Sequence, residues 1–355
     1  MEQQNSLQGR VWDSWELGEI IGRGNFGVVY KAKRSEYNMT FYAAIKHMSI
    51  PMSREERQKL LAEGLFTDAA SEKKYYDRIL EGLLKEIDLC NELKGHTNIV
   101  SYEDHKVIPK ASGIGYDVFI RMELLTPLTE VVRTRALTEG VILKIGKDMC
   151  NALTVLAQHG IIHKDIKPSN ILCSKDRNYK LGDFGISEYM HFEGRPQLIT
   201  GTVNYMAPEV YHRVNTGLAS DQYSLGLVLY WLCNGYTLPW AQPSGRTTTE
   251  EAAFRANQGR FSGQPIPGPR NASPELGNII MRACQFDPAQ RWQSPGEMAR
   301  ALENCGRQER DPVLKGEDEE DGESSVGYKI LLILLCAVIA LMLLAVGLFC
   351  IYAFS

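Results

Sequence analysis

The strongest constraint on this chain comes from residues 163–170, which read HKDIKPSN. Asp165 stands two residues before Lys167 and five residues before Asn170. A loop that supports phosphoryl transfer needs a carboxylate to accept the proton of an attacking hydroxyl, a cation to neutralise the transferring phosphoryl group and an amide oxygen to hold Mg²⁺. The three residues fit these roles in that order, although the octapeptide alone could also be a polar turn before a strand.

A glycine-rich motif lies near the start of the chain, where residues 22–27 read GRGNFG. Dinucleotide-binding folds also use this GxGxxG spacing, but there a helix follows it and an acidic residue comes about 20 positions later. Here Val28, Val29 and Tyr30 instead predict a β-strand. The motif therefore favours a hairpin whose turn lies over phosphate groups, where glycine lets the backbone approach the oxygens closely.

A predicted strand that ends in a single lysine follows the glycine motif. Residues 43–46 read AAIK, and Lys46 stands 19 residues beyond Gly27. An isolated lysine on a strand is usually a solvated surface residue. At this spacing behind a glycine-rich turn, we interpret it as the amine that holds the α- and β-phosphates of a nucleotide.

With these motifs the chain resembles the eukaryotic-type (Hanks-type) serine/threonine protein kinases over about residues 12–306. The resemblance implies an α+β, bilobal protein kinase fold, with a β-rich N-lobe that carries one main helix (about 12–124) and a mostly helical C-lobe (about 125–306). It implies ATP and Mg²⁺ as cofactors, with Mn²⁺ able to substitute. It also implies a non-specific serine/threonine protein kinase that acts on proteins carrying Ser or Thr.

Further motifs match the family in the expected order. Asp183 begins the tripeptide DFG 13 residues after Asn170, and the resemblance makes these two residues the metal ligands. Residues 207–209 read APE and end the activation segment. Thr202 matches the family threonine that contacts the catalytic Asp and Lys. Together, Thr202 and Lys167 indicate Ser/Thr rather than Tyr substrates.

Residues 51–95 depart most from the common family pattern. Residues 53–56 read SREE, a capping box that predicts a short helix closed by Gly64. A longer helix is expected from about Asp68 to Leu93, with Gly95 as its stop. The extra length ahead of this helix's second half is a candidate regulatory or docking surface. The predicted apolar face of the longer helix comprises Leu80, Leu83, Leu84, Ile87 and Cys90.

Kinases use one glutamate of this helix to pair with the strand lysine, because an unpaired ammonium would drift from the phosphates. We select Glu86, since it precedes residues 96–100 (HTNIV) as in the family, and Glu81 is the alternative. The resulting catalytic set is Asp165, Lys167, Lys46 and Glu86, and the metal set is Asn170 and Asp183.

The resemblance also implies which residues surround the nucleotide. Met122 would sit at the back of the pocket, and the backbones of Glu123 and Leu125 would hydrogen-bond the adenine. The nucleotide-binding set is Ile21, Gly22, Gly24, Gly27, Val29, Ala44, Lys46, Met122, Glu123, Leu125 and Leu172.

Supporting positions are expected in the C-lobe. Residues 141–159 have helical spacing and should lie beneath the catalytic loop. Asp221 opens an apolar helix and, by resemblance, hydrogen-bonds the backbone of the catalytic loop. Arg291 matches the family arginine that pairs with Glu209. These roles are structural.

After residue 306 the composition changes, first to a polar acidic segment and then to an apolar run. Residues 307–328 are polar and acidic and predict a solvated juxtamembrane linker. Residues 330–354 form an uncharged apolar run of 25 residues, long enough to span a hydrocarbon core of ~30 Å. We therefore expect one transmembrane helix at 329–354 and a single-pass protein of the cell membrane. A buried core helix is a poor alternative, and the kinase domain should be cytoplasmic because ATP is.

The composition of the chain limits the classes of partner that we expect it to bind. The net charge is −4 and no basic block is present, so no nucleic-acid partner is expected. The eight cysteines form no C-x-x-C pair and read as thiols in a reducing compartment. The expected partners are protein substrates, ATP and the membrane. Two alternatives stay open: a pseudokinase scaffold that binds nucleotide without transfer, and a small-molecule kinase of similar fold.

Overall fold

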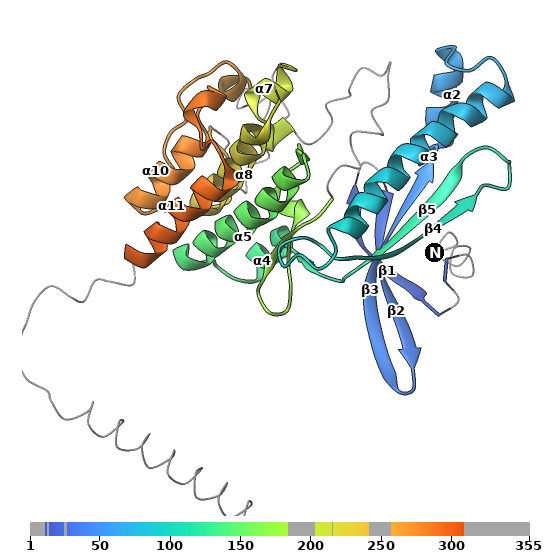
Figure 1. Cartoon of the computed structure of the whole chain (residues 1–355), viewed down its shortest axis with the longest axis horizontal. Coiled ribbons are helices and arrows are strands. Elements are labelled where there is room, and N and C mark those ends of the chain that lie inside the picture. Colours follow the sequence, from blue (N-terminus) through green and yellow to red (C-terminus); the bar gives the residue numbers. More distant parts are fainter. Residues whose placement is uncertain are drawn as a thin grey trace, which may run out of the picture. The chain divides into compact units, whose positions relative to one another are not determined.

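Five antiparallel strands form the sheet of the N-lobe in the computed structural model, which describes residues 11–12, 14–24, 27–183, 203–214, 216–240 and 257–308. Their spatial order is β1-β2-β3-β5-β4 (Figure 1). The tight turn between β2 and β3 places Tyr37 and Asn38 at positive φ, the geometry that suits a two-residue hairpin. The strands are β1 (Glu16–Gly24), β2 (Gly27–Glu36), β3 (Met39–Ile50), β4 (Tyr102–Pro109) and β5 (Tyr116–Met122).

Two helices follow β3, with the boundaries that the capping residues predict. Helix α2 (Arg54–Ala62) begins after Ser53, whose Oγ accepts the N–H of Glu56 at 3.1 Å. Gly64 follows its end at φ +74°. The N-cap of α3 (Ala69–Glu92) is Asp68, which exchanges hydrogen bonds with Ser71, and Gly95 follows its end at φ +92°. The predicted helix starts and stops are confirmed.

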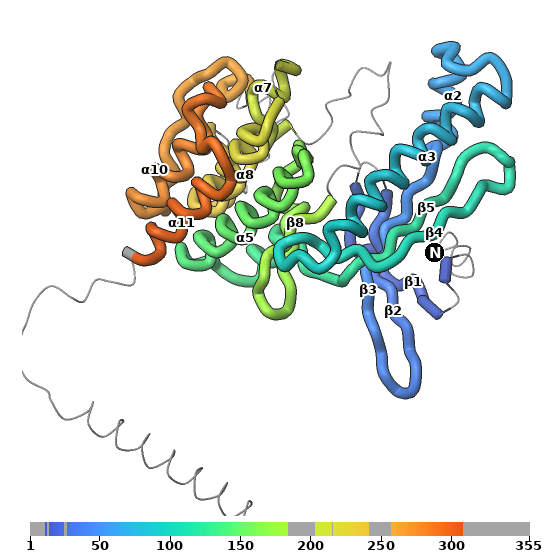
Figure 2. Tube along the Cα trace, in the orientation of Figure 1, coloured from blue at the N-terminus to red at the C-terminus, as the bar shows by residue number. Residues whose placement is uncertain are grey.

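Helix α3 packs against the sheet, and Figure 2 shows it running alongside β4 and β5. From its predicted apolar face, Leu83 and Ile87 are fully buried. Tyr76 and Ile79 join the same cluster, which the apolar pattern had not included. The helix is therefore anchored along most of its length.

The unusual region ahead of α3 is tied to it by a bidentate ion pair. Arg57 of α2 donates from Nε and Nη2 to the two carboxylate oxygens of Glu72, at 2.5 and 2.8 Å. Glu72 is only 3% exposed, so its charge depends on this partner. Phe66 packs against Tyr75 and Tyr76 between the two helices. This extension is thus an integral part of the N-lobe.

The C-lobe is mostly helical, and this completes the predicted bilobal α+β architecture. Its core forms where α5 and α8 pack together, with α10 on α8. A Cβ on Gly226 of α8 would lie 2.8 Å from the Cβ of Ala283 in α10, so only glycine permits this close approach. The helices are α4 (Leu128–Thr134), α5 (Glu139–Gln158), α7 (Pro208–Tyr211), α8 (Leu218–Cys233), α10 (Pro274–Ala283) and α11 (Pro295–Gln308).

The C-lobe also contains a small three-stranded sheet and three 3₁₀ turns. A three-stranded sheet joins β6 (Thr126–Pro127), β7 (Ile171–Cys173) and β8 (Tyr179–Leu181) in that order. The 3₁₀ turns are η1 (Pro168–Asn170), η2 (Val203–Tyr205) and η3 (Pro288–Gln290).

Asp221 supports the catalytic loop as predicted. Its two carboxylate oxygens accept the backbone N–H groups of His163 and Lys164, at 2.7 and 2.8 Å. The helix begins earlier than expected: α8 starts at Leu218, so Asp221 lies in its first turn and does not open it. Asp221 is 2% exposed.

The predicted pair of Glu209 and Arg291 is also confirmed. Arg291 donates from Nη1 and Nη2 to the two oxygens of Glu209, at 2.7 and 2.8 Å, and is fully buried. Ser220 adds a hydrogen bond to Glu209 at 2.6 Å. Burial alone would raise the pKa of Glu209, but the bonds from Arg291 and Ser220 hold that pKa below its usual value.

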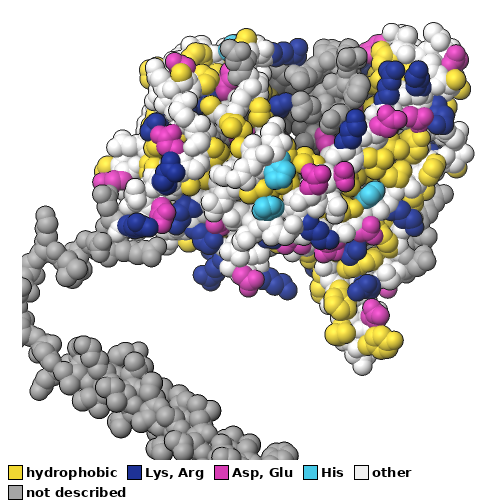
Figure 3. Space-filling model, in the orientation of Figure 1, with side chains coloured by type: hydrophobic (Ala, Val, Ile, Leu, Met, Phe, Trp, Pro, Cys, Tyr) yellow, Lys and Arg dark blue, Asp and Glu magenta, His cyan; other side chains and the backbone are white. Residues whose placement is uncertain are grey.

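Exposed hydrophobic side chains gather at the tip of the β2–β3 hairpin (Figure 3). They include Tyr37, which is 89% exposed. The six cysteines of the described ranges are free thiols. No helix within those ranges is long and apolar enough to cross a membrane, and the predicted transmembrane helix at 329–354 lies outside them.

Candidate active site

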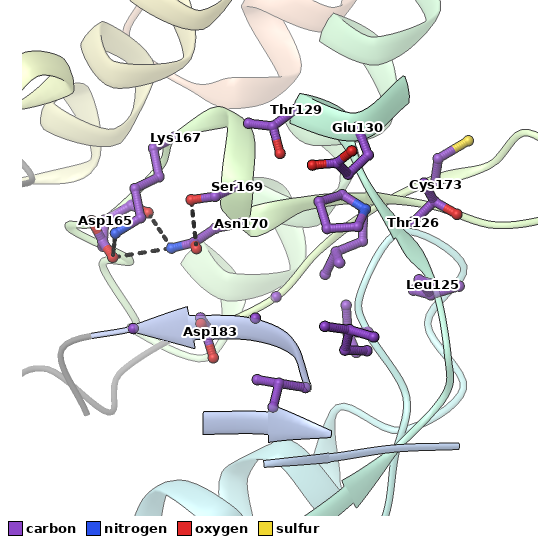
Figure 4. Close-up of a pocket in the computed structure, with 18 of the residues that line it drawn as sticks. Leu125, Thr126, Thr129, Glu130, Asp165, Lys167, Ser169, Asn170, Cys173 and Asp183 are labelled. Atoms are coloured by element: carbon purple, nitrogen blue, oxygen red, sulfur yellow. Dashed lines mark hydrogen bonds and ion pairs between the residues drawn. The ribbon is translucent and has the colours of Figure 1, made fainter. Parts of the chain in front are cut away.

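The catalytic loop brings three predicted residues together. Lys167 Nζ donates to Oδ2 of Asp165 at 2.7 Å. Asn170 Nδ2 donates to the same oxygen at 3.0 Å and to the backbone carbonyl of Asp165 at 2.9 Å. Figure 4 shows these bonds, with Asn170 held at the end of η1. One carboxylate oxygen of Asp165 is therefore fixed by two donors.

The other carboxylate oxygen of Asp165, Oδ1, differs from Oδ2 in its hydrogen bonding. Oδ1 is buried and has no hydrogen-bond partner among the described residues. An unsatisfied buried acceptor costs free energy, on the order of 1–3 kcal/mol, and such atoms often mark functional sites. Because Oδ2 is held, Oδ1 is the atom of Asp165 that can accept a proton from a hydroxyl placed beside it.

The loop is fastened to the segment that carries Asp183. His163 Nε2 donates to the carbonyl of Gly182 at 3.1 Å, and Gly182 N–H donates to the carbonyl of Asn170 at 2.9 Å. A Cβ on Gly182 would lie within 3 Å of side-chain carbons of Leu172 and Val100. The position of Asp183 relative to Asn170 is thus fixed by backbone bonds and by tight packing.

Lys46 reaches this segment from the N-lobe. Its Nζ lies 2.5 Å from Oδ1 of Asp183, and the lysine is 6% exposed. The surrounding protein disfavours the charge of Asp183, but the Lys46 ammonium outweighs this and lowers the pKa of Asp183 below its usual value. Asp183 is therefore held ionised. Its backbone has φ +58°, a left-handed conformation that Asp tolerates better than most residues.

The structure gives Lys46 an ion pair with Asp183, whereas the sequence led us to expect Glu86 as its partner. Glu86 is 5% exposed and lines a small apolar pocket of about 40 Å³ together with Asp183. The role of Glu86 stays a prediction.

Lys46, Asp165, Lys167, Asn170 and Asp183 all line one cleft with a volume of about 1590 Å³, whereas Glu86 and His163 are not part of its lining. Of the predicted nucleotide-binding residues, Ala44 and Glu123 are not among its lining, while Leu124 is, although it was not predicted. Ala44 is buried and pairs with Met122 across the sheet. The predicted residues that do line the cleft are Ile21, Gly22, Gly24, Gly27, Val29, Lys46, Met122, Leu125 and Leu172.

Glu123 has a structural role that the sequence did not reveal. Its Oε1 accepts the backbone N–H of Ser101 at 2.6 Å and the ammonium of Lys180 at 2.7 Å. Lys180 belongs to β8, so this carboxylate joins the link between the lobes to the strand that leads to Asp183. The part of Glu123 predicted to meet adenine is its backbone.

Comparison with known proteins agrees with this geometry. Residues 15–303 match the model of the family described as "Protein kinase domain". This chain belongs to the protein kinase family.

The chain is similar to a bacterial serine/threonine-protein kinase and to a plant protein kinase. It is 28% identical over 294 residues to serine/threonine-protein kinase PknB of Mycolicibacterium smegmatis, covering 81% of this chain and 42% of PknB. It is 31% identical over 238 residues to CBL-interacting protein kinase 15 of Oryza sativa, covering 66% of this chain and 48% of that protein. The chain spans less than half the length of these curated relatives.

Two glycines of the motif at residues 22–27 are in different environments: Gly27 is tightly packed, and Gly24 faces open space. A Cβ on Gly27 would lie 2.1 Å from the carbonyl oxygen of His47, and Gly27 has φ +155°, so β2–β3 packing requires glycine here. Gly24 has no atom within 4 Å of its would-be Cβ and lines the cleft. Gly24 is thus the position where the backbone is open to an approaching phosphate.

The predicted metal ligands fit a hard divalent cation. The amide nitrogen of Asn170 is committed to Asp165, and within the described part of the chain its Oδ1 has only a 3.4 Å contact from Ser169 Oγ. Amide and carboxylate oxygens are the donors that Mg²⁺ prefers, usually completed by phosphate oxygens and water. No group of three or more His, Cys, Asp or Glu in the described ranges forms a ready metal cage. The two residues fit a metal that arrives with a nucleotide.

Several predicted positions cannot be compared with the structure. Thr202, which indicated Ser/Thr substrates, lies outside the described residues. The same holds for residues 184–185 of the DFG tripeptide.

Proposed function

We propose that this kinase transfers the γ-phosphoryl group of ATP to Ser or Thr hydroxyls of proteins. The observation that carries the proposal is the state of Asp165: Lys167 and Asn170 hold Oδ2, while Oδ1 is a buried acceptor without a partner among the described residues. Asp183 and Lys46 line the same cleft. These groups supply a proton acceptor and the charges that a phosphoryl transfer needs.

In the proposed mechanism, Asp165 orients the substrate hydroxyl and accepts its proton at Oδ1. Lys167 neutralises charge that develops on the transferring group, and Lys46 holds the α- and β-phosphates. Asn170 and Asp183 would hold Mg²⁺, which neutralises phosphate charge when bound. The hydrogen bonds that Lys167 and Asn170 donate to Oδ2 hold the Asp165 carboxylate before substrate binds, which lowers the reorganisation needed during the reaction.

Direct measurement of transfer tests this function. The purified full-length chain, incubated with radiolabelled Mg-ATP, should label itself and generic protein substrates, and the label should appear as phosphoserine or phosphothreonine after acid hydrolysis. Nucleotide binding without any labelling would favour the pseudokinase alternative. Label on tyrosine would contradict the Ser/Thr assignment.

We also propose that residues 329–354 anchor the kinase in the cell membrane, with the kinase domain in the cytoplasm. The support is the uncharged run of 25 residues at 330–354, preceded by an acidic linker at 307–328. Full-length protein is expected to sediment with membranes and to resist carbonate extraction, whereas a chain that ends at Ser325 should be soluble.

A charge variant provides the matched control for the anchor. Ile339→Lys combined with Leu343→Lys keeps the chain length, but each lysine near the centre of a span costs about 2.5–3.5 kcal/mol of insertion free energy. This variant should behave like the truncated chain. Release of the wild type by carbonate, or cleavage of the kinase domain by protease added outside sealed cells, would contradict the proposed anchor or its orientation.

A further inference from the structure

Arg260 is a buried cation whose charge is met by backbone and amide oxygens. It is 2% exposed. Nη1 donates to the carbonyl of Met206 at 3.1 Å, and Nη2 donates to the carbonyl of Val203 at 2.9 Å and to Oδ1 of Asn257 at 2.6 Å. One planar guanidinium therefore grips both sides of η2, the turn between those two carbonyls.

Neighbouring residues strengthen this contact. The ring of Phe261 stacks on Tyr211 of α7, with centroids 4.0 Å apart and planes within 4°. The Nε2 of His212 donates to the carbonyl of Phe261 at 2.9 Å. The helical residues 257–261 thus back the whole segment 203–212.

The segment that Arg260 holds is part of the cleft wall. Val203, Met206, Val210 and Tyr211 line the same cleft as Asp165. The predicted nucleotide-binding residues come instead from the N-lobe strands, the link between the lobes and β7. The wall formed by residues 203–211 is therefore left for the second reactant, the protein that carries the hydroxyl.

We propose that Arg260 is a positioning residue for the protein substrate. By fixing two backbone carbonyls, it holds the wall at residues 203–206 so that a polypeptide lying along it presents its hydroxyl to Asp165. This inference rests on the proposed kinase function. The planar guanidinium of Arg260 can hold these carbonyls through strong, charge-assisted hydrogen bonds of fixed geometry. Such precise positioning matters because a small displacement of the bound substrate strongly slows transfer.

The test compares Michaelis constants in full-length protein. Arg260→Met should raise KM for a generic protein substrate by about 10-fold, the scale of losing a hydrogen bond to a charged group, while KM for ATP stays at the wild-type value. Arg260→Lys should have an intermediate effect, since an ammonium lacks the planar fork. Phe261→Leu, which keeps the cation but removes the ring stacked on Tyr211, should shift the same KM in the same direction.

Arg282→Met is the control, because Arg282 lies on the same lobe, packs on Trp292 at 3.9 Å and does not contact residues 203–212 through any bond in the described structure. It should leave both Michaelis constants unchanged. Equal shifts in both constants, or an unchanged KM for protein substrate in all three test variants, would overturn the inference.

Amide hydrogen exchange separates this inference from the proposed function. Exchange over residues 203–212 should rise in Arg260→Met and Arg260→Lys but not in Arg282→Met. If the wild type transfers no phosphate, the proposed function fails and with it the substrate role of Arg260. If the wild type is active and exchange over this segment is unchanged in the variants, the positioning role alone is wrong.

Discussion

Replacing Asp165 with asparagine is expected to lower the rate of phosphoryl transfer by about 10²–10⁴-fold, the range that a positioned general base contributes. The amide has nearly the shape of the carboxylate and can still meet Lys167, but it cannot accept a proton at the position of Oδ1. ATP binding should persist, because Asp165 does not contact Lys46 or Asp183 through any bond in the described structure. Single-turnover labelling and a fluorescent-nucleotide titration measure the two quantities separately.

The matched control for this substitution is Asp176→Asn in the exposed turn between β7 and β8. Asp176 is not among the residues that line the cleft, so the same chemical change at this position should leave transfer unchanged. If Asp165→Asn retained transfer within a few-fold of the wild type, Asp165 would not be the proton acceptor, and the proposed mechanism would be wrong at its central step.

Replacing Arg291 with methionine is expected to lower the free energy of unfolding by about 3–5 kcal/mol, because it leaves the Glu209 carboxylate buried without its partner. The guanidinium also donates to the carbonyls of Ala219, Gln285 and Phe286, which would lose a donor. Chemical denaturation of residues 1–308 measures the effect. Residues 1–307 form one compact unit, which supports the use of this fragment.

Two comparisons identify the cause of that loss. Arg282→Met breaks a half-exposed pair with Glu297 and should cost less than about 1 kcal/mol. Adding Glu209→Gln to Arg291→Met should restore part of the stability, since no buried charge is then left. A loss as small as that of Arg282→Met would show that the buried pair contributes little.

The pH dependence of stability follows from the same pair. Because the pKa of Glu209 is lower in the folded protein than its ordinary value of 4.5, its contribution is complete above that value. The contribution is then lost as pH falls through the lower folded-state pKa. In Arg291→Met the remaining desolvation favours the protonated acid, so this acid-side loss should shrink or reverse.

Local features were predictable from sequence because their causes lie within a few residues. Ser53 and Asp68 cap helices through their own side chains, and Gly64 and Gly95 provide the positive φ that follows a helix end. The spacing within residues 163–170 likewise determines which side chains meet Asp165.

Other features depend on groups brought together only by folding. The ion pair of Lys46 with Asp183 joins residues that are 137 positions apart, which local spacing does not encode. Arg260 was missed because its partners are mainly backbone carbonyls, and these leave no pattern in the sequence. The side chain of Glu123 was assigned no role for a similar reason: its partners lie 22 and 57 positions away.

The first turn of α8 carries three separate contacts on three successive residues. The carbonyl of Ala219 accepts Arg291, Ser220 bonds Glu209, and Asp221 accepts the backbone of the catalytic loop. Inserting or deleting one residue in this turn would rotate everything beyond it by roughly 100° about the helix axis, so the three contacts could not all be kept. The length of the chain is therefore fixed at this turn, whereas the exposed tip of the β2–β3 hairpin has no such requirement and can tolerate insertions.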